Sequence, residues 1–328
     1  MPDEYFYIIP FFSFLLSVII ILLGKKVIKK RDLSSQSIPL AGGLSIGLPC
    51  FAAGVLFLYF SGCPAEEATG ILTSSLLMFI FGVIDDRYEL SVKAKIATQS
   101  AAICLLVLQG IQTHIVYVGN IANIVITFIW IIGITNAFNH LDIMDGLAGS
   151  VAFIANLAFF ILGYVNGNML VMVLALTLGG TLSSFLIFNF PPAKIYMGNS
   201  GSHFLGFVLA SMALINSYAP LERPIALLAP LFILGLPIFD TCFLIIMRIR
   251  QNKSPFRKSD DHLAIRFLKS GYSKKKTLLV MFLIAAAFSL LGLFLSRLLN
   301  PLALLPVLII IFIGVNIIIK TNRAGNIG

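Results

Sequence analysis

Long apolar stretches separated by short polar ones run along the whole 328-residue chain. A helix needs about 20 mostly apolar residues to cross the hydrocarbon core of a bilayer. The pattern therefore predicts an all-α fold, a polytopic bundle of about 11 transmembrane helices. Gly and Pro interrupt several of these spans, so we expect local bends. The predicted spans are 6–23, 42–60, 69–84, 96–113, 120–135, 148–165, 169–187, 201–218, 225–247, 277–298 and 301–319.

Composition supports a membrane protein. Hydrophobic residues make up 59% of the chain and charged residues only 11%, whereas soluble domains carry about 25% charged residues. The low charge excludes a soluble globular enzyme, and the high apolar content excludes intrinsic disorder. Because the sequence shows no internal repeat and no long linker, it predicts one integral membrane domain over residues 1–328.

The net charge of +9 is interpreted here as a signal of topology. All but two of the 23 lysines and arginines fall in loops on one side of the predicted bundle, and only Arg223 and Arg297 fall on the other. The positive-inside rule places the basic loops in the cytoplasm, with the N-terminus outside and the C-terminus inside. An odd number of spans agrees with this orientation. The basic charge therefore does not indicate a nucleic-acid partner.

Acidic residues gather at the cytoplasmic ends of the predicted spans, where carboxylates are costly and usually mark a site. Asp85 and Asp86 end the third span, in the segment FGVIDDRYELSVKAK. Adjacent carboxylates repel each other, so both ionise readily only beside cations such as Lys95 or a divalent metal. A solvated helix end is the alternative interpretation of this pair.

A second polar segment, TNAFNHLDIMDGLAG, follows the fifth span. Its Asn136, Asn139, Asp142 and Asp145 recur every three residues, so on a helix they would share one broad polar face. Amides and carboxylates in that arrangement suit metal-bound phosphates and sugar hydroxyls. Ordinary capping of an aqueous helix end is the alternative.

Two further segments carry candidate chemistry. In PPAKIYMGNSGSHFLGF a span begins close to Asn199, so the backbone N–H groups of its first turn could face an anion. In the ninth span, Gly235 and Pro237 are expected to break the helix just before Asp240, an acidic residue at membrane depth. The basic loop that follows contains DDHLAIR, and its His262 and Arg266 would share one helical face.

In their order, the motifs GxxDD, NxxNxxDxxDGLAG, MGxxGSxxLG and PIFD followed by a basic loop with a histidine resemble the polyprenyl-phosphate N-acetylhexosamine-1-phosphate transferases. The resemblance runs from about residue 82 to residue 273. It implies an enzyme of the plasma (inner) membrane with its active site facing the cytoplasm. The implied reaction transfers a sugar-1-phosphate from a UDP-sugar to polyprenyl (undecaprenyl) phosphate, releases UMP and initiates a lipid-linked glycan. Mg²⁺ is the implied cofactor, with Mn²⁺ as a substitute.

The resemblance also assigns roles to residues. The aspartate pair and the NxxDxxDG core would be catalytic, with either a direct or a covalent aspartyl mechanism open. Implied partners are the UDP-sugar, the polyprenyl phosphate and membrane lipids, and a homodimer is left open. The catalytic residues would be Asp85, Asp86, Asp142 and Asp145, the metal ligands Asp86, Asp145 and Asn199, and the substrate-binding residues Lys95, Asn136, Asn139, Asp240, Arg250, His262 and Arg266.

Two departures from the family pattern refine this prediction. The family usually has Asp in MGDxGS where this chain has Asn199, which removes one negative charge from the predicted Mg²⁺ site. The peptidoglycan branch, phospho-MurNAc-pentapeptide translocase, has consecutive histidines where this chain has only His262. The sequence therefore favours the branch that primes O-antigen, teichoic acid or similar glycans, with the peptidoglycan enzyme as an alternative.

A cation-coupled transporter is the alternative from another class, with Asp240 and the aspartate pair as its ion pathway. Such a pathway needs polar groups on both faces of the membrane, whereas the candidate residues here gather on the cytoplasmic face.

Overall fold

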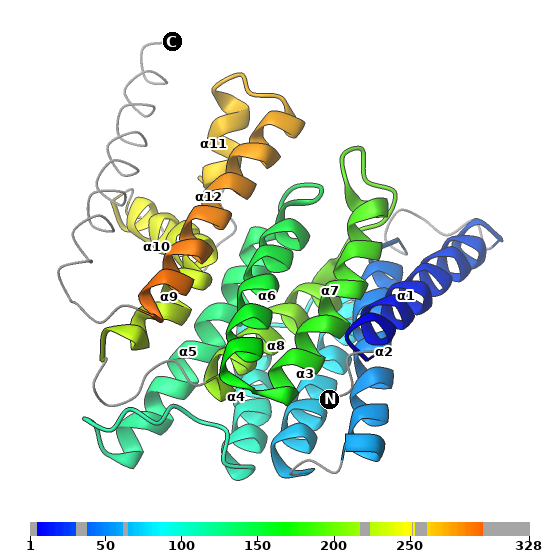
Figure 1. The fold of residues 1–328 in the computed structure, drawn as a ribbon. Coiled ribbons are helices and arrows are strands. Elements are labelled where there is room, and N and C mark those ends of the chain that lie inside the picture. The colour runs from blue at the N-terminus through cyan, green and yellow to red at the C-terminus, as the bar shows by residue number, and fades with distance from the viewer. Residues whose placement is uncertain are drawn as a thin grey trace. The chain divides into compact units, whose positions relative to one another are not determined.

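The computed structural model describes residues 5–30, 38–61, 65–216, 224–250, 252 and 261–297. Over these ranges the chain forms α-helices α1–α12 and a short 3₁₀ helix, η2, and no strand (Figure 1). The predicted all-α fold class is confirmed. The helices are α1 (Tyr5–Lys30), α2 (Ile38–Ser61), α3 (Ala65–Tyr88), α4 (Val92–Leu108), α5 (Asn120–Leu141), α6 (Leu147–Asn166), α7 (Met169–Asn189), α8 (Gly198–Ile215), η2 (Pro224–Leu228), α9 (Ala229–Ile233), α10 (Gly235–Arg250), α11 (Leu263–Lys269) and α12 (Lys274–Leu295).

Seven of the described helices are long and apolar enough to cross a membrane, or eight if the bent pair that ends in α10 forms one span. The sequence predicted about 11 spans. Two of the others correspond to α4, which has 17 residues, and to α8, which begins with a polar segment. The predicted span 301–319 lies outside the described residues. The orientation of the termini stays a prediction.

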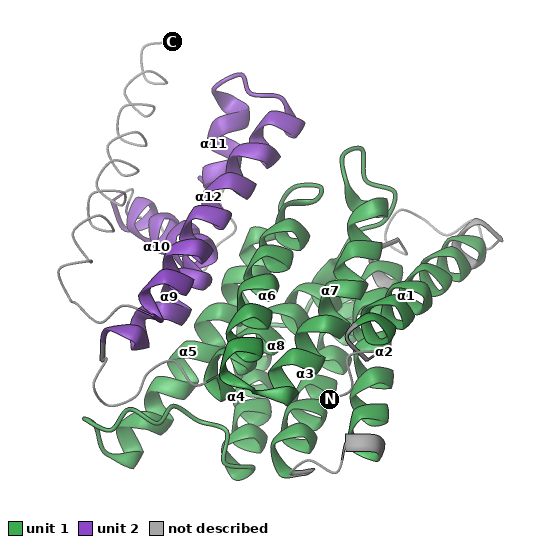
Figure 2. Ribbon diagram, viewed as in Figure 1, with its two compact units in different colours: residues 1–217 green, residues 218–328 purple. Residues whose placement is uncertain are grey.

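The described residues group into two compact units, residues 1–217 and residues 218–328, which are described separately (Figure 2). The single domain predicted over 1–328 stays a prediction. In the first unit, α8 is the central helix and packs against α2, α3, α5, α6 and α7. Its side chains from Ser200 to Ala213 are all buried. Helix α8, which begins with a polar segment, is therefore enclosed by the other helices of the first unit.

Glycines let the neighbouring helices approach α8 closely. A Cβ on Gly82 of α3 would lie 2.4 Å from the Cα of Ser200, and one on Gly43 of α2 would lie 2.1 Å from its Oγ. Farther along α8, a Cβ on Gly206 would lie 2.9 Å from the Cα of Thr135 in α5. Small residues of this kind allow backbones to pack tightly where helices meet inside a membrane.

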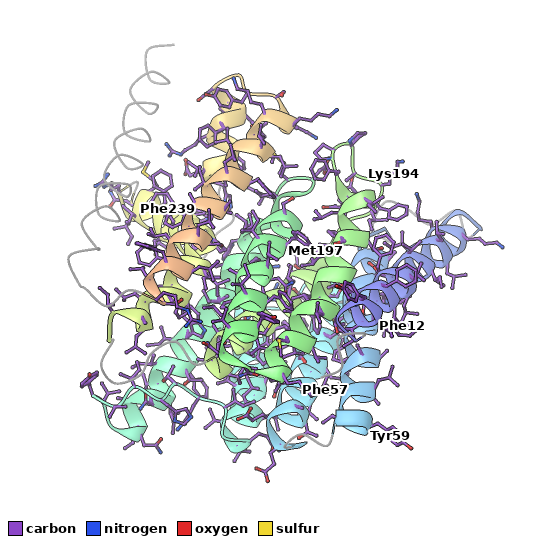
Figure 3. The ribbon with its side chains drawn as sticks, in the orientation of Figure 1. Phe12, Phe57, Tyr59, Lys194, Met197 and Phe239 are labelled. Atoms are coloured by element: carbon purple, nitrogen blue, oxygen red, sulfur yellow. The ribbon has the colours of Figure 1, made fainter. Side chains whose placement is uncertain are left out.

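The outer surface of the first unit carries large apolar side chains. Phe12 on α1 is 44% exposed and Tyr59 near the end of α2 is 79% exposed, whereas Met197, just before α8, is 1% exposed (Figure 3). An apolar exterior around a core that contains buried serines and threonines suits a lipid environment, because no water is present there to favour polar side chains.

The second unit is built around α12, which packs against α9, α10 and α11. The chain bends by 77° between the segment Ile225–Ile233 and α10. The bend predicted next to Gly235 and Pro237 is therefore present. Pro237 lies in the first turn of α10, where a missing N–H costs nothing. Ser289 of α12 donates a hydrogen bond to the carbonyl of Ile233 at 3.1 Å and so ties α12 to the end of α9, next to the bend.

We expect Gly82→Ala to destabilise the protein by about 1–3 kcal/mol, because the new methyl group would meet the backbone of α8. Gly133→Ala in α5 is the matched control, since a Cβ there meets no atom within 4 Å. Removing a helical glycine at an open position should stabilise by up to about 1 kcal/mol. Thermal unfolding of the detergent-purified protein measures both, and equal shifts in Tm would contradict the close approach at Gly82.

Candidate active site

The carboxylate of Asp86 caps the N-terminus of α8. Its Oδ1 accepts the backbone N–H of Asn199 at 2.6 Å, and its Oδ2 accepts the N–H and the hydroxyl of Ser200 at 3.0 and 2.6 Å. The first N–H groups of a helix lack partners within it, and Met197, the N-cap residue, supplies no side-chain hydrogen bond. Gly82 and Asp86 are four residues apart, hence on one face of α3. The anion predicted to face this helix start is the protein's own Asp86.

The neighbouring Asp85 has a different set of partners. It is 2% exposed, its Oδ1 accepts the N–H of Leu90 at 2.7 Å, and its Oδ2 accepts the ammonium of Lys95 at 2.5 Å. His203 of α8 lies on the same side, with its Nε2 4.0 Å from that oxygen. Neither ring nitrogen of His203 has a hydrogen-bond partner among the described residues. The two adjacent carboxylates are therefore stabilised by separate donors rather than by a shared cation.

The turn between α5 and α6 carries Asp142 and Asp145. Helix α5 ends at Leu141, and Asp142 is its C-cap with a ψ of 58°. The prediction that these two aspartates continue the helical face of Asn136 and Asn139 is therefore wrong. The departure from the helix is at Asp142 itself, whose ψ of 58° lies outside the helical region, and Gly146, with a φ of 76°, is the N-cap of α6.

Three carboxylates gather where this turn meets the end of α3. Burial, followed by the charges of Asp86 and Asp145, raises the pKa of the half-buried Asp142 carboxyl to about 7. Its side chain forms no hydrogen bond with any residue that the structure describes. Asp145 accepts the N–H of Ala193 at 3.3 Å. Asp142 therefore lies half-buried beside two other carboxylates, which favours its protonated form.

The two predicted amides tie helices together. The side chain of Asn139 donates to Oδ1 of Asn199 and to Oγ of Ser202, both at 2.9 Å, and so links α5 to α8. Asn136 exchanges two hydrogen bonds with Gln99 of α4, at 3.0 and 3.3 Å. Gln99 is 1% exposed and was not predicted. An amide close to the start of the apolar span 96–113 was the signal that could have indicated it.

Asn189 is the other residue that sequence reasoning missed. It is 5% exposed at the end of α7, accepts the N–H of Gly146 at 2.8 Å and donates to the carbonyl of Ile195 at 2.7 Å. It therefore joins the turn of Asp142 and Asp145 to the loop before α8, on which Lys194 lies exposed (Figure 3). Its position in FNFPP, one residue removed from two prolines, resembled an ordinary helix end.

The remaining predicted residues belong to the second unit. Asp240 is 1% exposed, and both of its oxygens are used, one by Nδ1 of His262 at 2.7 Å and one by the N–H of Leu263 at 2.8 Å. Arg266 follows His262 by four residues on α11, as expected. Arg250 is exposed at the last position of α10. The carboxylate of Asp240 therefore binds His262 and the backbone of Leu263, and neither of its oxygens is left without a protein partner.

The fit of a divalent cation can be judged from the oxygens that remain. Among the described residues no three His, Cys, Asp or Glu side chains are placed to hold one ion. Oxygens of Asp86 and Asn199 already accept hydrogen bonds. Asp142 and Asp145 retain acceptor capacity, because a carboxylate has about four lone-pair sites. Mg²⁺ is usually held by one or two carboxylates together with substrate phosphates and water, so the carboxylate cluster fits this ion.

Comparisons with known proteins agree on one family. The sequence profile described as glycosyl transferase family 4 matches residues 68–217. A probable undecaprenyl-phosphate N-acetylglucosaminyl 1-phosphate transferase of Bacillus subtilis is 32% identical over 301 residues, which cover 85% of this chain and 82% of the relative. A decaprenyl-phosphate N-acetylglucosaminephosphotransferase of Mycobacterium leprae is 31% identical over 294 residues, 78% and 72% of the two chains. An undecaprenyl-phosphate alpha-N-acetylglucosaminyl 1-phosphate transferase of Thermotoga maritima is 28% identical over 263 residues, 80% and 79% of the chains.

We expect Asp86→Ala to lower the Tm of the purified protein, because it removes the cap from a buried helix start. Loss of an N-cap costs about 0.5–2 kcal/mol. Asp142→Ala is the matched control, since that carboxylate accepts no hydrogen bond from a described residue and is repelled by its neighbours. A Tm that falls more for Asp142→Ala than for Asp86→Ala would contradict the capping role.

The raised pKa of Asp142 predicts a pH dependence of stability. Because the folded state binds this proton more tightly than the unfolded chain, its contribution to stability is present at low pH and is lost as pH rises toward about 7. Without divalent ions, the Tm should fall between about pH 4 and about pH 7, and Asp142→Asn should flatten that slope. An equally steep slope in the variant would show that another group titrates.

Proposed function

The chain belongs to glycosyl transferase family 4, and from this membership we propose that it transfers a sugar-1-phosphate to a membrane polyprenyl phosphate. The donor we propose is a UDP-sugar, with N-acetylglucosamine as the sugar to test first, and the second product is UMP. The observation that carries the proposal is the 32% identity to the Bacillus subtilis relative over 85% of the chain. That similarity is accompanied by a cluster of three carboxylates, in which burial and the charges of Asp86 and Asp145 raise the pKa of Asp142.

In the proposed reaction a phosphate oxygen of the lipid forms a bond to the β-phosphorus of the donor. The bond from that phosphorus to the bridging oxygen breaks, and UMP leaves with the electron pair. The second pKa of a phosphate monoester is about 6, so the nucleophile is largely ionised at neutral pH. The protein therefore needs to align anions and neutralise their charge more than it needs to create a strong base.

Each site residue takes a role that its contacts allow. Asp142 and Asp145 would hold Mg²⁺, with Asp86 and Asn199 as the further ligands predicted from the sequence. When bound, the ion would neutralise charge on the donor's diphosphate and so stabilise the transferring phosphoryl group. Asp86 holds the start of α8 in place. Lys95, held by Asp85, would supply positive charge from the protein itself.

The two alternatives are tested by one assay. Purified protein is incubated with polyprenyl phosphate, Mg²⁺ and a panel of UDP-sugars, and release of UMP is measured. An enzyme of the proposed kind releases UMP, whereas a cation-coupled transporter does not. Preference for UDP-MurNAc-pentapeptide over UDP-GlcNAc would favour the peptidoglycan enzyme instead. Membership of a transferase family supports the enzyme over the transporter.

We expect Asp145→Asn to lower turnover at least about 100-fold, on the scale of removing a major electrostatic contribution to the transition state. Glu66→Gln is the matched control, because this exposed carboxylate lies in the first turn of α3, about 30 Å along the helix from Asp86. Turnover of Asp145→Asn close to that of the wild type at saturating Mg²⁺ would reject the proposed metal role.

A separate prediction concerns Asn199→Asp. An aspartate oxygen can still accept the hydrogen bond from Asn139, and it adds a charge that hard cations prefer. If position 199 contacts the ion, the half-saturating Mg²⁺ concentration should fall, with the largest gain in rate at low Mg²⁺. Titrating activity against Mg²⁺ for both proteins measures this. Two superimposable curves would mean that position 199 does not contact the metal.

A further inference from the structure

The buried carboxylate of Asp240 fixes the ring of His262. An ionised carboxylate can only accept hydrogen bonds, so Nδ1 of His262 must carry the hydrogen in the 2.7 Å contact. The second oxygen accepts the N–H of Leu263, which holds the backbone at the start of α11 as well. Nε2 of His262 has no hydrogen-bond partner among the residues that the structure describes. The ring therefore has one nitrogen fixed and one available to a ligand.

Arg266 is fixed in a comparable way. Its guanidinium carbon lies 4.8 Å from the centroid of the Phe243 ring, a cation–π contact. Its Nε donates to the carbonyl of Asp261 at 3.2 Å, and one terminal nitrogen lies 3.3 Å from the carboxylate of the same residue. These contacts come from the residue that precedes His262 and from α10, and together they restrain a long side chain.

The two contacts connect α10 to the start of α11 at similar residue spacings. Asp240 and Phe243 are three residues apart and share one face of α10, while His262, the N-cap of α11, precedes Arg266 by four residues. Two residues of α10 thus contact the two side chains: Asp240 contacts His262, and Phe243 contacts Arg266.

We propose that Asp240 and Phe243 are positioning residues, which act through His262 and Arg266 to form a binding site for the diphosphate of a nucleoside-diphosphate sugar. The proposal rests on the transfer reaction proposed above for its choice of ligand. Asp240, first predicted to bind substrate, does so only through His262. His262 and Arg266 are already restrained before an anion binds, so their side chains lose little conformational entropy on binding. This small entropy loss is the source of the affinity.

Stability alone does not account for a carboxylate at this position. Burying a charge carries a desolvation penalty, and a well-packed apolar side chain is often as stabilising as a buried polar pair. Asp240 is buried within an apolar helix. The carboxylate is explained if its role is to orient His262, since a leucine of similar volume could not do so.

The test is a pair of double-mutant cycles on the full-length protein. Affinity for UDP-GlcNAc is measured by calorimetry, and KM for donor, KM for acceptor and kcat are measured in the transfer assay. Asp240→Asn should weaken donor affinity about 10-fold, as expected for losing a charge-assisted hydrogen bond, and leave acceptor KM within about 2-fold. Phe243→Leu should weaken donor affinity about 3-fold.

The proposal requires that these effects disappear when the positioned residue is absent. In a His262→Ala background, Asp240→Asn should change donor affinity by less than about 2-fold, and likewise Phe243→Leu in Arg266→Ala. Ser289→Ala is the control for general damage to this unit, because it removes a buried hydrogen bond that does not involve these residues. It should leave donor affinity unchanged.

Additive effects in either cycle, or equal losses in donor and acceptor KM, overturn the corresponding positioning role. A wild type that binds no UDP-GlcNAc overturns the proposed diphosphate site outright. A wild type that binds UDP-GlcNAc but transfers no sugar phosphate rejects the proposed reaction, while non-additive cycles in the binding data still support the positioning. Failure of the positioning proposal is therefore distinguishable from failure of the proposed transfer reaction.

Discussion

The hydrogen bonds between Asp86 and the start of α8 are the interaction on which the first unit depends. A helix that is buried from its first turns must satisfy its free N–H groups inside the protein, since neither lipid nor water is available there. Asp86 does this from α3, and Gly82 one turn earlier lets the two backbones meet. Once α8 is fixed, Asn139 can reach both Asn199 and Ser202, and α5 takes its place beside it.

The aspartates of the first unit have different surroundings. Asp85 pairs with Lys95, and Asp86 accepts three hydrogen bonds. Asp142 is the C-cap of α5, and burial together with the charges of Asp86 and Asp145 raises the pKa of its carboxyl. A cation placed beside these carboxylates would lower their mutual repulsion, which is the physical basis of the metal role proposed above.

The sequence predicted what depends on local pattern and missed what depends on distant partners. Apolar runs predicted the helices, and the aspartate motifs predicted the segments that meet at α8. The continuation of α5 through Asp142 was wrong because a three-residue repeat does not reveal the non-helical backbone of Asp142, at which α5 ends. The roles of Gln99 and Asn189 were missed because their partners are 37 and 43 residues away. Local sequence around either amide does not identify the residue that it contacts.

The amide at position 199 has a physical rationale in the same cluster. Oδ1 of Asn199 accepts a hydrogen bond from Asn139, and its backbone N–H donates to Asp86. A carboxylate there would accept the same bond but would place a fourth negative charge beside Asp86, Asp142 and Asp145. The neutral amide avoids that added repulsion. Asn199 therefore links α3, α5 and α8 through its hydrogen bonds without adding a charge to the carboxylate cluster.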